Sequence, residues 1–262
     1  MNMKLTIAII GTGNVAWHLS SALENAGHEI LEVYGRDIEK AQQLSSRLYA
    51  TEAQDHLDFT ESKANLFIIA VSDQAIAPIA EAILLPEQSI LVHTSGTMTL
   101  HVLSYSSADY TGILYPLQGF TKSRDLSFEE VPFLLEAEDK GTLKTLKKLC
   151  KSLKSPSYEI KSRDRRSIHV AAVFAANFTN HMVYLAESIM HRQGLDFNIL
   201  KPLIIEQMNK TLQLGPSEAQ TGPAIREDIN TLENHHDYLS YNEQLAEIYR
   251  NISQDIMDTQ KP

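Results

Sequence analysis

Residues 4–19, KLTIAIIGTGNVAWHL, join an apolar run to a glycine turn and then to a helical period. The run over 4–10 predicts a buried strand, and the apolar spacing over 14–26 predicts a helix. Gly11 allows a tight turn between the two, Gly13 removes a side chain from that turn, and Ala16 lets the helix pack closely on the strand. A strand, a glycine turn and a helix in this order begin a βαβ unit, so the feature favours a parallel sheet.

Up to about residue 160, short apolar runs continue to alternate with helical periods, which is typical of βαβ units. After residue 162 the strand signal disappears, and the segment 163–194 predicts one long helix that is apolar on nearly all sides, so that something must bury it all round. The predicted strands are 29–34, 64–71, 89–93, 110–115, 131–137 and 157–160, and the other predicted helices are 37–47, 74–85, 140–154, 197–213, about 224–238 and 240–258.

These patterns predict an α/β fold in which a Rossmann-type, mainly parallel sheet precedes an all-α C-terminal domain. We place the sheet domain at residues 1–161 and the helical domain at 162–262. The formal net charge of −10, spread along the chain, argues against a nucleic-acid partner. No apolar stretch approaches the roughly 20 residues of a membrane span. The single cysteine, Cys150, excludes an internal disulfide framework, so we expect a cytoplasmic protein.

The glycine turn also has a chemical meaning. The N-terminus of a helix carries a partial positive charge and free N–H groups, which suit a diphosphate. The spacing Gly-x-Gly-x-x-Ala after a strand therefore predicts a dinucleotide site, although an ordinary strand–helix turn has the same letters. The turn residues expected to bind the coenzyme are Gly11, Thr12, Gly13, Asn14 and Val15.

The residue at the tip of the second predicted strand selects between the two nicotinamide coenzymes. It lies about 20 positions beyond the turn, where an acidic residue would bind the ribose hydroxyl of NAD. In this chain that residue is Arg36. Its planar guanidinium can bind a phosphate through two charge-assisted hydrogen bonds, so we expect the coenzyme to be NADP. The alternative is a solvated arginine at a strand end, and the neighbouring Asp37 is a plausible helix N-cap.

Three loops follow predicted strands and should converge at the carboxyl edge of the sheet, where ligands of open parallel sheets bind. They are VSDQ (71–74), HTSGT (93–97) and YPLQGF (115–120). Their polar residues can contact the nicotinamide or the substrate, or can bond only to their own backbone as turn residues do. Ser95 lies outside any GxSxG motif, which argues against a hydrolase. The loop residues expected in the coenzyme site are Val71, Ser72, Asp73, Thr94, Ser95 and Gly96.

Polar residues on the long predicted helix are the candidates for catalysis. In a regular helix His169 and Asn180 fall within about 20° of each other, with Asn177 on the same side. His169 can be a proton donor or a substrate ligand, or a structural histidine, and the two asparagines can orient the substrate. Arg226 should lie in the first turn of a helix opened by Pro223. There it opposes the helix dipole and calls for an anionic partner, either a nearby acid or the substrate. No metal-ligand spacing is present, so we expect no metal site.

Six stretches in both halves of the chain carry a resemblance to a known family. They are GTGNVA (11–16), VSDQAI (71–76), HTSGT (93–97), YPLQGF (115–120), HVAAVFAANF (169–178) and TGPAIREDI (221–229). Through them the whole chain resembles a bacterial family with a Rossmann-like half and a helical domain of unknown function. The layout also resembles the 6-phosphogluconate dehydrogenase-like and β-hydroxyacid dehydrogenase-like superfamily, and the first half is similar to pyrroline-5-carboxylate reductase and to deazaflavin-dependent NADP reductases.

The resemblance implies an NADP-dependent oxidoreductase that forms a homodimer through its C-terminal helices. Two departures qualify it. Hydroxyacid dehydrogenases carry an SGG turn where this chain has PLQG (116–119), and they place a catalytic lysine on the long helix, which here has none. We expect a small carbonyl, hydroxy-acid or imine substrate in a cleft between the domains. The alternative is a non-catalytic protein that binds or senses NADP(H).

Overall fold

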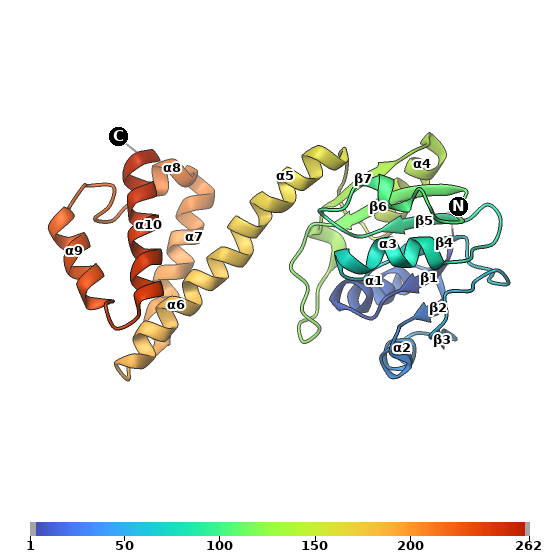
Figure 1. The fold of residues 1–262 in the computed structure, drawn as a ribbon, viewed down its shortest axis with the longest axis horizontal. Coiled ribbons are helices and arrows are strands. Elements are labelled where there is room, and N and C mark those ends of the chain that lie inside the picture. The colour runs from blue at the N-terminus through green and yellow to red at the C-terminus, as the bar shows by residue number, and fades with distance from the viewer. Residues whose placement is uncertain (1–3, 260–262) are drawn as a thin grey trace. The chain divides into compact units, whose positions relative to one another are not determined.

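The computed structural model describes residues 4–259, and the chain forms two compact units that divide between Asn177 and Phe178. In the described residues the first unit carries the sheet and the second is helical (Figure 1). The last strand ends at Glu159 and the next helix begins at Ser162. The predicted domain boundary after residue 161 thus marks the change from mixed to helical secondary structure. That two domains divide at this residue stays a prediction.

Within residues 4–259, eight strands form one sheet in the order β3-β2-β1-β4-β5-β6-β7-β8. All neighbouring strands are parallel except β6 and β7. The first six follow the order of a Rossmann fold, as the sequence predicted, and β7 and β8 extend the sheet. The strands are β1 (Thr6–Ile10), β2 (Glu29–Tyr34), β3 (Glu52–Gln54), β4 (Leu66–Ile69), β5 (Ile90–His93), β6 (Tyr110–Pro116), β7 (Phe133–Ala137) and β8 (Ser157–Glu159).

Helices cover both faces of this sheet, because successive side chains of a strand point to opposite faces. In β1, Ile7 and Ile9 enter the core beneath α1, α2 and α4, whereas Ala8 and Ile10 enter the core beneath α3. The four helices are α1 (Asn14–Asn25), α2 (Ile38–Ser45), α3 (Asp73–Ala82) and α4 (Lys140–Ser152), with short 3₁₀ segments at Leu100–Leu103 and Phe128–Glu130. Both faces of the central strands are therefore buried, which explains their continuous apolar runs.

The chain runs from β1 outward to β2 and β3, then returns to β4 on the other side of β1. The connections after β1 and after β4 therefore leave in opposite directions at the carboxyl ends of two adjacent strands. A crevice forms at such a switch point, and ligands of open α/β sheets bind there.

Two details of the sheet unit were not predicted. The edge strand β3 is only three residues long and pairs with β2, so it shows little apolar pattern. The predicted helix 74–85 ends at Ala82 instead, because Leu84 forms a parallel bridge with Asp58.

The predicted long helix is not a regular α-helix. A π-helical segment, Val173–Phe178, separates α5 (Ser162–Ala172) from α6 (Thr179–Arg192). Because a π-helix bonds residue i to i+5, it turns less per residue than an α-helix. The predicted alignment of His169 with Asn180 is therefore wrong. The remaining segments are a 3₁₀ turn at Phe197–Leu200, α7 (Lys201–Leu214), α8 (Pro216–Ala219), α9 (Ile229–Tyr238) and α10 (Glu243–Thr259).

Burial of the long helix on all sides is also not found within one chain. Val170, Phe174 and Phe178 keep 49%, 63% and 47% of their surface exposed. The apolar surface that the sequence predicted is present, but much of it faces outward.

The histidine at the end of β5 predicts how the stability of the sheet unit depends on pH. His93 is fully buried, and its Nδ1 accepts a hydrogen bond from the Ser95 N–H at 3.1 Å. Burial, aided by the charge of Arg165, lowers the pKa of His93 from 6.5 to about 4. The unfolded chain therefore binds a proton that the folded chain does not between these two pH values. The free energy of unfolding should fall as the pH drops through this window, by on the order of 3 kcal/mol from this group.

Urea unfolding at stepped pH, followed by tryptophan fluorescence, checks this contribution. His93→Asn should remove that part of the pH dependence, because the asparagine oxygen can accept the same bond without titrating. The control is His56→Asn, since His56 is exposed. If the His93 variant and the wild type lose stability equally between pH 6.5 and 4, the histidine is not held neutral by the fold.

Candidate functional site

The two glycines of the first turn have different reasons to be glycine. Gly11 has φ +129°, and a Cβ there would lie 2.3 Å from the carbonyl oxygen of Ala70. Gly13 is exposed, with φ −75° and ψ −175°, which any residue can adopt. A Cβ on Gly13 would meet only the Ala70 oxygen, at 3.8 Å, an ordinary contact. The protein itself thus needs a glycine at position 11 but not at 13, so the bare backbone at Gly13 is available to a ligand.

The turn leads into the N-terminus of α1, which is open to an anion. No side chain caps this end, and its first turn carries no acidic residue. The unpaired N–H groups and the helix dipole therefore have no internal partner of negative charge. The side chain of Asn14 points to the β6 side, where its Nδ2 donates to the Phe120 carbonyl at 2.8 Å.

Two cavities meet at this turn, of about 500 Å³ and about 630 Å³. Both are lined by Thr12, Val71 and Ser72, so they adjoin at the ends of β1 and β4. Every residue predicted to bind the coenzyme lines one or both of them. The first cavity, here called the inner cavity, is lined by Thr12, Gly13, Asn14, Val15, Ala70, Val71, Ser72, Asp73, Thr94, Ser95, Gly96, Tyr115 and His169. The second, the outer cavity, includes Gly11, Thr12, Tyr34, Gly35, Arg36, Asp37, Lys40, Val71 and Ser72.

The outer cavity carries an uncommitted positive charge. Arg36 is exposed at the end of β2 and has no hydrogen-bond or ion-pair partner within residues 4–259. Asp37 is already engaged, because it caps α2 by accepting from the N–H groups of Glu39 and Lys40 and pairs with the Lys40 ammonium at 3.1 Å. The hydrogen bond from Lys40 is the main cause that lowers the pKa of Asp37. Arg36 can therefore attract a phosphate at this wall.

The inner cavity is lined by polar groups that bond partly to the backbone. The Thr94 hydroxyl donates to the Ile69 carbonyl at 3.3 Å. The Ser95 hydroxyl accepts from the N–H groups of Thr97 and Met98, at 3.0 Å and 2.9 Å. These bonds hold the loop after β5 in its turn, so both side chains have a structural role whatever else they contact.

An ion pair between buried Arg165 and partly buried Glu136 fixes α5 against the sheet and so places His169. Arg165 is fully buried, and its guanidinium bonds the Glu136 carboxylate of β7 at 2.7 Å and also the Met98 carbonyl. His169 lies one helical turn further along the same face. Its Nδ1 is 2.9 Å from the Tyr115 hydroxyl, and the two rings meet edge to face.

Sequence reasoning missed Tyr115. It belongs to the stretch YPLQGF, from which no residue was named among the expected site residues. Gln118 is exposed, accepts a bond from the Gly119 N–H, and lines neither cavity. The available signal was that Tyr115 lies at the carboxyl end of a central strand.

The other predicted catalytic residues do not line these two cavities. Asn177, in the π-helical segment, and Asn180, in the helical unit, are both exposed. Arg226 also belongs to the helical unit, in a turn that precedes α9. That helix begins at Ile229 with Asp228 as its N-cap, so Arg226 is not in a first helical turn and the dipole argument for it is wrong.

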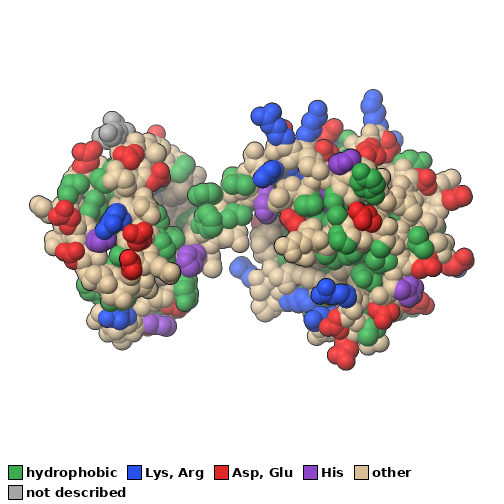
Figure 2. All heavy atoms as spheres, viewed as in Figure 1, with side chains coloured by type: hydrophobic (Ala, Val, Ile, Leu, Met, Phe, Trp, Pro, Cys, Tyr) green, Lys and Arg blue, Asp and Glu red, His purple; other side chains and the backbone are tan. Residues whose placement is uncertain are grey.

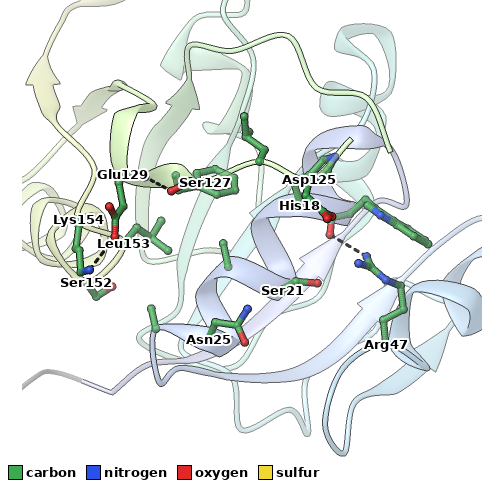
Figure 3. A pocket seen from close by; sticks show the side chains of 15 residues that line it. His18, Ser21, Asn25, Arg47, Asp125, Ser127, Glu129, Ser152, Leu153 and Lys154 are labelled. Atoms are coloured by element: carbon green, nitrogen blue, oxygen red, sulfur yellow. Dashed lines mark hydrogen bonds and ion pairs between the residues drawn. The ribbon is translucent and has the colours of Figure 1, made fainter. Parts of the chain in front are cut away.

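A further cavity, of about 440 Å³, runs along α1, the loop before β7 and the end of α4 (Figure 3). Two of its cations are engaged, since Lys154 pairs with Glu129 at 2.7 Å and the Arg47 guanidinium lies 3.9 Å over the Trp17 ring. It contains none of the residues predicted to bind the coenzyme.

In the part of the chain that the structure describes, no group of three or more His, Cys, Asp or Glu side chains is placed to hold a metal ion. No helix over the same residues has the length and apolarity to cross a membrane.

Family comparisons match both halves of the chain. Residues 6–96 match the family described as "NADP oxidoreductase coenzyme F420-dependent", and residues 131–256 match a domain of unknown function, DUF2520. A comparison with proteins of curated function found no match.

Solved structures extend the likeness to the whole chain. The crystal structure of the "putative NADP oxidoreductase BF3122" from Bacteroides fragilis is 35% identical, with a TM-score of 0.90, over 97% of this chain and 98% of that one. Protein TM1727 from Thermotoga maritima is 21% identical, with a TM-score of 0.68, over 97% and 98% of the two chains.

The 1-pyrroline-5-carboxylate reductase of Streptococcus pyogenes is 13% identical, with a TM-score of 0.66, over 97% and 99%, and shares the fold. The chain therefore belongs to the family of the Bacteroides fragilis protein, in which a Rossmann domain of the NADP oxidoreductase type precedes a helical domain of unknown function.

Proposed function

We propose that this protein is an NADP-dependent oxidoreductase that acts on a small carbonyl, hydroxy-acid or imine compound in the inner cavity. The observation that carries the proposal is the exposed backbone at Gly13. Neither the φ and ψ angles nor the surrounding atoms require a glycine there, so a ligand is the reason for the missing side chain. The cavity volumes are in the range of small-molecule sites, and the coenzyme residues expected from the sequence converge on them. The relation to the Bacteroides fragilis protein supports the same class of reaction.

The residues present fit a phosphorylated dinucleotide. The N–H groups at Gly13 and the start of α1 would bind the diphosphate. Arg36 would bind a 2′-phosphate from the outer cavity. When bound, the coenzyme supplies a hydride to the substrate. The inner cavity would hold the nicotinamide and the substrate among Ser72, Thr94 and His169.

His169 is our candidate for the proton source, because it is the titratable imidazole among the residues that line the inner cavity. Its Nε2 has no hydrogen-bond partner among the described residues, whereas Nδ1 faces Tyr115. The long helix offers no lysine for this role. Non-catalytic binding or sensing of NADP(H) is the outcome that would replace the proposal if no substrate is turned over.

Coenzyme titrations test the coenzyme site. Arg36→Ala should raise the Kd for NADPH about 10-fold to 100-fold and leave NADH unchanged, because it removes charge-assisted bonds to the 2′-phosphate alone. Gly13→Ala should weaken both coenzymes, with little change in thermal stability, because its Cβ fills the place of the diphosphate. Arg124→Ala is the control, since Arg124 is exposed and lines neither cavity. Wild-type preference for NADH, or equal binding by all variants, would remove the proposed site.

Turnover tests the reaction. NADPH oxidation is measured against keto acids, aldehydes and cyclic imines, with an oxidised deazaflavin included because the matching family is described by coenzyme F420. The wild type should oxidise NADPH with at least one of them. His169→Gln should lower kcat by about 10²-fold to 10⁴-fold at unchanged NADPH affinity, as loss of a general acid does. Tight NADPH binding without turnover of any compound favours the non-catalytic alternative.

We also propose that two copies associate through their helical units. Figure 2 shows hydrophobic side chains at the surface of this unit. Among its exposed apolar residues are Ile199, Leu203 and Leu212, at 65%, 65% and 81%. Exposed apolar surface of this kind is typical of protein interfaces. A second copy, related by twofold symmetry, would cover the same residues on both chains.

Light scattering coupled to size exclusion measures this association. The wild type should elute at about twice the 29.4 kDa of one chain. Leu203→Glu should shift it toward the monomer, since a charge would be buried in the contact. The control is Tyr49→Glu, because Tyr49 is 86% exposed on the sheet unit. A monomeric wild type at micromolar concentration would contradict the proposal.

A further inference from the structure

The contact between Tyr115 and His169 brings together two parts of the sheet unit that are far apart in sequence. Tyr115 is half-buried near the end of β6, and His169 lies on α5. The Tyr115 oxygen is 2.9 Å from Nδ1, the ring centroids are 5.8 Å apart, and the ring planes cross at 69°. Both side chains line the inner cavity beside the start of α3 and the glycine turn.

Gly96 shows that the fold makes room for this pair. A Cβ at position 96 would lie 2.5 Å from His169 Nδ1 and 2.8 Å from Tyr115 Cζ. The φ angle of Gly96 is not in the left-handed region, so its backbone conformation does not require a glycine. The close approach of the loop after β5 to both rings is therefore the reason for a glycine at 96, and this loop limits how the rings can move.

Burial of the pair favours a protonated tyrosine. Burial raises the pKa of the Tyr115 phenol, and the carboxylate of Asp73 adds to that effect. The charge of Arg165, which is paired with Glu136, opposes the effect of burial and outweighs that of Asp73. His93, in the strand next to β6, is held neutral by burial. Burial thus disfavours a tyrosinate at this place, which argues against a relay in which Tyr115 gives its own proton to the histidine.

We propose that Tyr115 is the positioning residue for His169: its oxygen accepts a hydrogen bond from Nδ1–H and leaves Nε2–H to protonate the substrate. This inference rests on the proposed function. The two electrons come as hydride from the reduced nicotinamide coenzyme, which is oxidised. The Nε2–H bond breaks, the substrate oxygen or nitrogen gains the proton, and the imidazolium becomes a neutral imidazole. The other proton stays bonded to Nδ1 and hydrogen-bonded to the Tyr115 oxygen throughout. Solvent restores the proton on Nε2.

The substrate-free test is the tautomer of His169, read by ¹⁵N NMR of histidine-labelled protein, with His169→Gln identifying the signal. In the wild type at a pH where the ring is neutral, Nδ1 should carry the proton. Tyr115→Phe should return the ring toward the Nε2–H form, because the acceptor is gone. Tyr110→Phe is the matched control, since Tyr110 begins the same strand, is exposed and lines neither cavity.

Gly96→Ala is a second route to the same result, because it pushes the rings apart while both remain. It should abolish the Nδ1–H signature, whereas Gly119→Ala, where a Cβ meets nothing within 4 Å, should not.

With a substrate from the turnover panel, Tyr115→Phe should lower kcat about 10-fold to 100-fold and move the basic limb of the pH profile to lower pH. The KM for NADPH should stay within about twofold, and the His169→Gln, Tyr115→Phe double variant should be no slower than His169→Gln alone.

An Nε2–H tautomer in the wild type, or one that Tyr115→Phe does not alter, would overturn the inference. So would additive losses in the double variant. Failure of the proposed function has a different signature, in which the Tyr115-dependent tautomer is present but NADPH is neither bound nor oxidised.

Discussion

The backbone of Gly11, directly after β1, is fixed by contacts with the ends of β2 and β4, and the rest of the site depends on these two contacts. Its N–H donates to the Tyr34 carbonyl at the end of β2 at 2.8 Å. Its Cα faces the Ala70 carbonyl after β4 so closely that a Cβ would lie 2.3 Å from the oxygen. Because β1 separates β2 from β4, the turn after β1 is fixed across the switch point of the sheet. The bare backbone at Gly13 and the open end of α1 take their positions from this turn.

A second fixed contact places the other wall of the inner cavity. Arg165 is fully buried and Glu136 partly buried, so the guanidinium charge is costly without its partner. Through it the first turns of α5 are tied to β7 and to the loop after β5, and His169 follows one turn later. The glycine turn on one wall and the histidine on the other are thus set by two independent constraints within one compact unit. This is the arrangement that a preorganised site requires.

The sequence predicted the sheet well because each central strand is buried on both faces and its apolar run is unmistakable. The edge strand β3 was missed because three residues on an edge carry no such signal. The glycine turn and the position of Arg36 at the end of β2 were both predicted, since their spacing follows from one βαβ unit.

Predictions for the helical half were weaker, for physical reasons. The π-helical segment changes the face of the helix on which every later residue lies, and no residue type predicts such a segment. The start of α9 was placed at a proline, whereas the Asp228 side chain caps a helix that starts five positions later than about 224. Tyr115 escaped notice because its meeting with His169 depends on how α5 crosses the sheet, which no local pattern records.

A crystal structure of the protein soaked with NADP⁺ tests the central claim most directly. We expect the diphosphate against the Gly13 backbone at the start of α1, the 2′-phosphate on Arg36, and the nicotinamide in the inner cavity beside His169 and Tyr115. An empty glycine turn at saturating coenzyme, or a coenzyme bound elsewhere with Arg36 facing solvent, would contradict it.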